Sequence, residues 1–230
     1  MTGKPDYFAR TTALISLTFA IVAIVVSYYQ QVLAQEFQKE QFEILQKEKL
    51  TIKVNPNVDG SIRLTNYNLG HLGHVVQISW KIIISNTGNQ KLSITDYSVT
   101  RGGSPESLYY SGIDGGIINK KLQVIEFPLI LDPGESRLAY IFVGITVPPL
   151  AYKILSSLDK NATLTDILVM KVLGKQGIDY YGNTVQYEEF EGGLFHFSVK
   201  DTKKAQRFWI KFTTGRGNIY YGTGMAYNPN

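Results

Sequence analysis

The chain has 230 residues, no cysteine, and a formal net charge of +4 at pH 7. The lack of cysteine excludes disulfides, cysteine-ligated zinc, iron–sulfur clusters and cysteine nucleophiles, and it favours a bacterial or archaeal protein. The charge excess is too small to indicate a nucleic-acid partner. The 15 Tyr and 11 Phe residues favour β-structure.

The N-terminal part of the sequence contains one long uncharged stretch, from Thr11 to Gln35. Its apolar centre predicts a single transmembrane helix over residues 12–29, preceded by a short tail, residues 1–11. A helix of that length extends about 27 Å at ~1.5 Å per residue, close to the ~30 Å core of a bilayer. We therefore expect a single-pass membrane protein.

The flanks of this stretch fit both a signal anchor and a cleavable signal peptide, because Lys4 and Arg10 precede the apolar run. The small residues before a cut after Ala34 favour cleavage. The sequence lacks the short polar segment that follows the apolar run of a typical signal peptide, so we predict an uncleaved anchor. Arg10 abuts the span, so we expect a cytoplasmic N-terminus and an extracytoplasmic domain. Three lysines beyond the span weaken this assignment and favour the reverse: Lys39, Lys47 and Lys49.

Residues 30–50 are rich in Gln, Glu and Lys and contain no Gly or Pro, so they predict a continuation of the same helix. Leu33, Phe37 and Ile44 form a loose apolar stripe. The stripe is compatible with a short coiled-coil stalk that pairs two chains into a homo-oligomer. We favour a solvated juxtamembrane helix, because only about two heptads are present and Glu40 falls at a seam position.

Residues 51–230 contain many short β-like segments separated by turn residues, which predicts one antiparallel β-sandwich. Asp59-Gly60 predicts a hairpin between the first two strands. A single helix inside the domain is expected at Leu150–Asp159, a long loop at Arg101–Lys121, and an irregular tail at Gly215–Asn230 with an edge strand at Ile219–Tyr221. The predicted strands are Thr51–Asn55, Ser61–Asn66, Val75–Ser85, Lys91–Thr100, Leu122–Leu131, Arg137–Val147, Ile167–Leu173, Val185–Phe190, Leu194–Val199 and Arg207–Thr213.

Three turn-and-strand motifs carry a resemblance to a known fold. Ser79–Asn89 reads SWKIIISNTGN, Leu92–Val99 reads LSITDYSV, and Leu131–Ser136 reads LDPGES. Together they resemble bacterial immunoglobulin-like or fibronectin-like sandwich domains, and Asp179–Asn183 is similar to a hairpin near the end of such domains. The resemblance implies a fold and carries no catalytic residues.

The C-terminal segment has a charge bias, since residues 200–230 contain six Lys or Arg residues and one Asp. In the strand predicted at Arg207–Thr213, alternation places Arg207, Trp209 and Lys211 on one face. Such a face is compatible with binding to anionic lipid, an acidic polymer or a partner protein. The interpretation that we favour is an edge strand that Lys and Arg protect against aggregation.

Other reactive side chains form no convincing constellation in the sequence. His71 and His74 lie beside glycines, which predicts solvated loop histidines rather than a metal site. Glu188 and Glu189 are adjacent, so they point to opposite faces of a strand and do not cooperate easily with each other. Glu191 and Asp179 complete this acidic group. The stretches Gly112–Gly116 and Gly215–Gly224 match no phosphate-binding pattern. We expect no cofactor, metal site or catalytic site.

Two functions are compatible with these observations. The first is a membrane-anchored, non-catalytic binding or assembly module whose partners are the lipid bilayer and an unidentified protein or envelope polymer. The second is a hydrolase acting on envelope material with a site assembled from distant loops. We favour the first, because the sequence contains a single span, a sandwich pattern and no catalytic motif.

Overall fold

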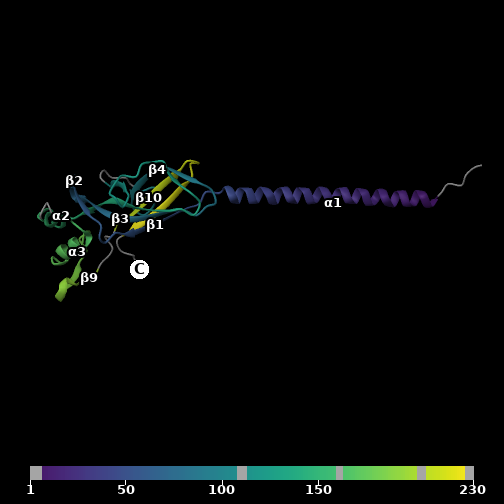
Figure 1. The fold of residues 1–230 in the computed structure, drawn as a ribbon. Helices are drawn as coiled ribbons and strands as arrows, with labels where there is room; N and C mark the ends of the chain where they lie inside the picture. The colour runs from purple at the N-terminus through teal and green to yellow at the C-terminus, as the bar shows by residue number, and fades with distance from the viewer. Residues whose placement is uncertain (1–6, 108–112, 159–162, 201–205, 226–230) are drawn as a thin grey trace, which may run out of the picture. The chain divides into compact units, whose positions relative to one another are not determined.

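The computed structural model describes residues 7–107, 113–158, 163–200 and 206–225. The chain divides into two compact units, Met1–Lys47 and Glu48–Asn230. The first unit contains one described helix, α1, and the second contains all the strands that the structure describes (Figure 1).

Helix α1 runs from Tyr7 to Gln46 and has 40 residues. At ~1.5 Å per residue it is about 60 Å long, roughly twice the thickness of a bilayer core. Its large apolar side chains between Leu14 and Tyr29 are at least 49% exposed. The hydroxyl of Thr18 donates to the carbonyl of Leu14 at 2.9 Å, so this polar group is satisfied within the helix. By length and composition, the helix can span a membrane.

The helix ends four residues before its predicted end at residue 50, and Glu48 explains why. The Glu48 side chain is 4% exposed and belongs to the second unit. Its carboxylate accepts hydrogen bonds from Thr214 Oγ1 at 2.6 Å and Asn218 Nδ2 at 2.8 Å. Two residues later, the buried Leu50 begins the first strand. These tertiary contacts replace the helix, although the local sequence favours its continuation.

The larger sheet, here called sheet 1, has the order β1-β3-β7-β5, and β2 also pairs with β3. All its pairings are antiparallel. The long strands β3 and β7 form its centre and pair over twelve positions. The strands of sheet 1 are β1 (Leu50–Pro56), β2 (Ile62–Asn68), β3 (His74–Asn86), β5 (Asp114–Ile118) and β7 (Ser136–Val147).

The predicted hairpin at Asp59-Gly60 is wrong, because β1 and β2 do not pair with each other. Both strands pair with β3, one after the other along the same side. The segment between them instead contacts the residues at the start of helix α3 (Asp166–Gly174). Leu164 O accepts from Ile62 N at 2.7 Å, and Gly60 O accepts from Asp166 N at 3.3 Å. A turn motif predicts that the chain reverses or bends at that point. It does not determine which strand the following segment pairs with.

The second sheet, here called sheet 2, has the order β11-β10-β4-β6 and is also antiparallel. Strands β8 and β9 form a separate hairpin. The predicted edge position of β10 is wrong, because β10 lies between β4 and β11. The bounds are β4 (Leu92–Arg101), β6 (Leu129–Leu131), β10 (Arg207–Thr214), β11 (Ile219–Met225), β8 (Val185–Glu189) and β9 (Phe195–Val199).

Three other predicted segments differ from the structure. The expected loop Arg101–Lys121 contains β5, whose pairing with β7 relies on backbone hydrogen bonds. The expected strand Leu122–Leu131 is reduced to β6, and Leu122 and Val124 are 75% and 71% exposed. The expected irregular tail contains β11, which is longer than Ile219–Tyr221.

The two sheets pack their apolar faces against one core. Sheet 1 contributes Trp80, Ile82 and Ile141, and sheet 2 contributes Phe208 and Phe212. A second cluster covers the remaining part of the same sheet 1 face. It contains Val76 and Ile78 of β3, Ile145 and Val147 of β7, and Val169 and Leu173 of a helix. Since alternate residues share a face, one face of β3 and β7 is covered first by helices and then by sheet 2.

The helices of the second unit are α2 (Pro149–Ser156) and α3 (Asp166–Gly174), seen beside β2 and β3 in Figure 1. The predicted helix at Leu150–Asp159 is confirmed as α2 in its described part. The predicted strand at Ile167–Leu173 is wrong, because this segment forms α3. The side chain of Thr165 accepts from Leu168 N at 3.3 Å and caps the helix. A short apolar run without alternation is compatible with either element, and tertiary packing decides between them.

Candidate functional site

The outward face of β10 carries the three residues predicted as an interaction patch. Arg207, Trp209 and Lys211 alternate with the buried Phe208, Ile210 and Phe212 and are each half-buried. We call these three residues the basic–aromatic face. Since β10 is an interior strand, protection of a free sheet edge does not explain its cations.

The neighbouring strands surround the basic–aromatic face with small polar residues and one ring. Thr100 and Thr223 lie opposite Trp209, while Ser98 and Tyr221 lie opposite Lys211. The indole Nε1 of Trp209 donates to Gly102 O at 3.2 Å, which fixes the orientation of the ring. The result is an indole held between two positive side chains on a sheet surface.

The cations of this face differ from Arg216, the other described arginine of the C-terminal segment. Arg216 lies 3.8 Å from the carboxylate of Glu48 and donates to Gln90 at 2.7 Å. Within the part of the chain that the structure describes, neither Arg207 nor Lys211 forms an ion pair. Lys203 and Lys204, which contribute to the predicted charge bias, lie outside the described residues. Two cations of the face are thus available to an anionic partner.

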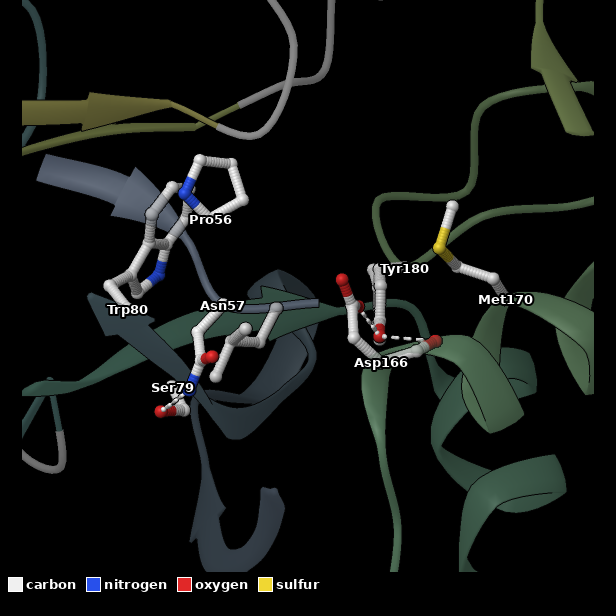
Figure 2. Close-up of a pocket in the computed structure, with 8 residues that line it drawn as sticks. Pro56, Asn57, Ser79, Trp80, Asp166, Met170 and Tyr180 are labelled. Atoms are coloured by element: carbon white, nitrogen blue, oxygen red, sulfur yellow. Dashed lines mark hydrogen bonds between the residues drawn. The ribbon is translucent and has the colours of Figure 1, made fainter. Parts of the chain in front are cut away.

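A pocket that sequence reasoning missed lies where the cover of sheet 1 changes from sheet 2 to the helices. We call it the seam pocket; its volume is about 80 Å³. Figure 2 shows Asp166, Tyr180 and Met170 on one side of it, opposite the residues of β1, β3 and the loop after β1. The lining residues are Pro56, Asn57, Ile78, Ser79, Trp80, Asp166, Met170 and Tyr180.

Asp166 supplies the carboxylate of the seam pocket. It is the first residue of α3, and its carboxylate accepts a hydrogen bond from the Tyr180 hydroxyl. Burial raises the pKa of Asp166, and the Tyr180 hydrogen bond lowers it by a smaller amount. No Lys, Arg or His among the described residues pairs with this carboxylate. The pocket therefore contains a desolvated acid without a cationic partner from the described chain.

The opposite wall carries a buried donor. Trp80 is 2% exposed, and its indole Nε1 has no hydrogen-bond partner in the described structure. Its ring packs edge-on against Phe208, with 4.8 Å between the centroids. Nearby, Asn57 Nδ2 donates to Ser79 Oγ at 3.0 Å, which leaves Asn57 Oδ1 as an acceptor. The sequence pattern around Trp80 predicts an ordinary core residue of a strand. Nothing in the sequence therefore indicated that Trp80 lines a pocket.

The histidines do not assemble a site. His71 is exposed in a short 3-10 helix, Gly70–Leu72, as expected for a loop histidine. His74 differs from the prediction: it begins β3, is half-buried, and stacks on the ring of Tyr152 with 3.9 Å between the centroids. Among the residues that the structure describes, no group of three or more His, Asp or Glu residues is placed to hold a metal.

The acidic group predicted around Glu188 is also dispersed. Glu189 pairs with Lys175 at 2.7 Å, and this hydrogen-bonded pair lowers the pKa of the glutamate. Asp179 is buried, and its carboxylate accepts from the backbone of Tyr181 at 2.9 Å and of Asn183 at 2.7 Å. Glu191 lies in a second 3-10 helix, Glu191–Gly193. Asp179 thus stabilises a turn, and these carboxylates do not face one another across a cleft.

The glycine-rich segments have structural explanations where they are described. In β11, a Cβ atom on Gly222 would lie 2.5 Å from Ile52 Cγ2, and one on Gly224 would lie 2.4 Å from Phe208 Cζ. These glycines permit close packing between β11 and the side chains of β1 and β10. Gly112 lies outside the described residues.

No family model matches this sequence, and no curated protein matches it.

Proposed function

We propose that this protein is a membrane-anchored, non-catalytic binding module. In this proposal residues 12–29 of α1 form an uncleaved signal anchor, and the N-terminus is cytoplasmic. Residues 48–230 form an extracytoplasmic domain of a bacterial protein, with an immunoglobulin-like or fibronectin-like sandwich. The apolar length of α1 and the two antiparallel sheets with a shared core support these assignments.

The basic–aromatic face is the observation that carries the binding function. Arg207 and Lys211 are four residues apart on one strand, so their Cα atoms are separated by about 13 Å. Trp209 lies between them with its ring held by Gly102. Two separated cations and a ring on one sheet surface fit an extended polymer that carries regularly spaced carboxylates or phosphates. We therefore favour an acidic envelope polymer as partner, and an acidic protein surface is the alternative.

Binding is tested with the full chain in a maltoside detergent, using alginate as the acidic polysaccharide and polyglutamate as the acidic polypeptide. R207E/K211E should weaken binding of the favoured polymer at least tenfold, because it replaces two attractions with two repulsions. Added NaCl should weaken wild-type binding in the same direction. K120E/K121E is the matched control, since it makes the same charge change on an exposed loop.

Equal affinity of wild type and R207E/K211E for the acidic polymers would show that the basic–aromatic face is not the binding site. Preference for polyglutamate would favour a protein partner. The orientation is tested separately by adding protease to intact cells. Cleavage of residues 48–230 is expected, and complete protection until lysis would contradict an extracytoplasmic domain.

The hydrolase alternative has no specific structural observation in its favour. The carboxylates that would serve it, Glu188, Glu189 and Asp179, do not converge. Reproducible turnover of envelope material that is lost on substitution of one carboxylate would favour the enzyme instead.

A further inference from the structure

The seam pocket combines an acid with apolar walls and is separate from the basic–aromatic face. Its carboxylate belongs to Asp166, which is held by Tyr180 through a hydrogen bond to the carboxylate. One carboxylate oxygen points away from Tyr180 in Figure 2. Asp166 is half-buried, and a carboxylate that is partly removed from water is less favourable than an exposed one unless a cation or several hydrogen bonds compensate it. The described residues supply no such cation, so the pocket is electrostatically complementary to a positive ligand.

The other walls restrict the kind of cation. Trp80 and Tyr180 provide aromatic rings, and Met170 provides a polarizable thioether. Pro56 and Ile78 add apolar surface. An ammonium group is attracted to a carboxylate and to aromatic rings, and an attached alkyl chain is accommodated by the apolar walls. A strongly hydrated metal ion needs more oxygen ligands than this lining offers.

The size of the cavity limits the ligand further. A cavity of ~150 Å³ accommodates benzene, which has six carbon atoms, so ~25 Å³ is needed for each heavy atom. The seam pocket, at about 80 Å³, therefore holds about three heavy atoms. That is the size of an ethylammonium to propylammonium group, and also of the end of a lysine side chain.

We propose that the seam pocket binds a primary alkylammonium group, with Asp166 as the counter-ion and Asn57 Oδ1 as a second acceptor. The group belongs either to a free short-chain amine or to a lysine of a protein partner. This site is independent of the basic–aromatic face, so either proposal can fail without the other.

The chain offers a selective reporter for this test, because it contains only two tryptophans. In full-length W209F labelled with ¹⁵N-tryptophan, the single indole N–H signal belongs to Trp80 in the pocket wall. The protein is kept in a maltoside detergent, since choline and ethanolamine headgroups carry ammonium groups of their own. Propylammonium chloride is titrated against a matched series of NaCl, and 1-propanol serves as the neutral probe of equal size.

We expect a saturable shift of the Trp80 signal with propylammonium and none with 1-propanol. D166N should weaken propylammonium binding at least tenfold, because it removes the charge and retains the shape. D59N is the control, since it removes the same charge from an exposed position in the neighbouring loop. No saturable shift, an equal response to 1-propanol, or equal affinity in D166N would overturn the proposal.

A second measurement needs no variant at Asp166. Affinity should be highest for ethyl- and propylammonium and should fall for tert-butylammonium, which has five heavy atoms, because the cavity holds about three. A steady rise in affinity with chain length through hexylammonium would indicate non-specific apolar binding and would contradict the proposal. Nα-acetyl-lysine amide, compared with its Nε-acetylated form, decides the source. If Nα-acetyl-lysine amide binds and its Nε-acetylated form does not, the natural ligand is a lysine of a protein partner. If propylammonium binds and Nα-acetyl-lysine amide does not, the natural ligand is a free amine.

Discussion

Substitution of Gly222 by alanine is the most direct test of how the two sheets are closed against each other. Gly222 lies in β11 and faces β1 of the other sheet. A Cβ atom at this position would lie 2.5 Å from Ile52 Cγ2 and 3.0 Å from Val54 Cγ2. Ordinary van der Waals contact begins at 3.4 Å. Ile52 would therefore have to retreat by about 1 Å, which an already packed interface resists.

The expected loss of stability follows from two opposing effects. Overpacking in a well-packed interior costs ~1–3 kcal/mol. Replacing glycine by alanine recovers ~0.5–1 kcal/mol by restricting the unfolded chain. We therefore expect G222A to lower the free energy of unfolding by up to ~2.5 kcal/mol, with a central value of ~1 kcal/mol. G103A is the control, because a Cβ atom there meets no atom within 4 Å, so only the gain of ~0.5–1 kcal/mol from the restricted unfolded chain is expected.

The assay is guanidinium unfolding of the full chain in maltoside, followed by tryptophan fluorescence. A double-mutant cycle with I52A identifies the cause of the loss. I52A alone should cost ~2 kcal/mol, at the low end for an isoleucine, because Ile52 is only partly buried. In the I52A background, G222A should cost clearly less than in the wild type, since the Ile52 methyl group is gone and the milder approach to Val54 Cγ2 at 3.0 Å remains. An equal cost of G222A in both backgrounds would refute the steric explanation.

Three further predictions concern the helices. Because burial raises the pKa of Asp166, the folded state retains this proton longer than the unfolded state, and the ionised carboxylate is destabilising above that pKa. The free energy of unfolding of D166N relative to that of wild type should therefore increase as the pH rises through the raised pKa. Unfolding measured at several pH values tests this, and a decrease of that difference with rising pH would contradict it. T165A should lower the free energy of unfolding by ~1 kcal/mol through loss of the α3 cap. T165S keeps the hydroxyl that caps the helix, so its stability should stay close to that of the wild type. If residues 30–50 pair two chains, L33C should form a disulfide-linked dimer in membranes under mild oxidation. The chain has no other cysteine that could form such a dimer. The solvated-helix interpretation that we favour predicts that L33C forms no more dimer than Q35C.

Several strands were predictable because their side-chain pattern is local. β3, β7 and β10 each place apolar residues on a buried face with a period of two or form a continuous apolar run. Their existence and approximate bounds therefore follow from a short window of sequence. β5 lacks such a pattern, since only its last two residues, Ile117 and Ile118, are apolar and buried, and it was expected as part of a loop.

The candidate sites differ in the same way. The basic–aromatic face was predictable, because alternation along one strand places Arg207, Trp209 and Lys211 together. The seam pocket was not, because Trp80 and Asp166 are far apart in the sequence and belong to different layers. Asp166 directly precedes Ile167–Leu173, which was expected to be a strand, so the sequence did not indicate its position at a helix terminus.

The sequence by itself determined that the protein has one long apolar helix and a mainly β second unit, because helix length, hydropathy and strand alternation are properties of neighbouring residues. The tertiary structure alone decided that residues 166–174 are helical, that β1 and β2 follow each other along β3, and that two different layers share one face of sheet 1. These outcomes depend on which distant surfaces remove the most apolar area from water while their backbone groups stay hydrogen-bonded. The seam pocket, whose carboxylate has no cationic partner among the described residues, exists only where those two layers meet.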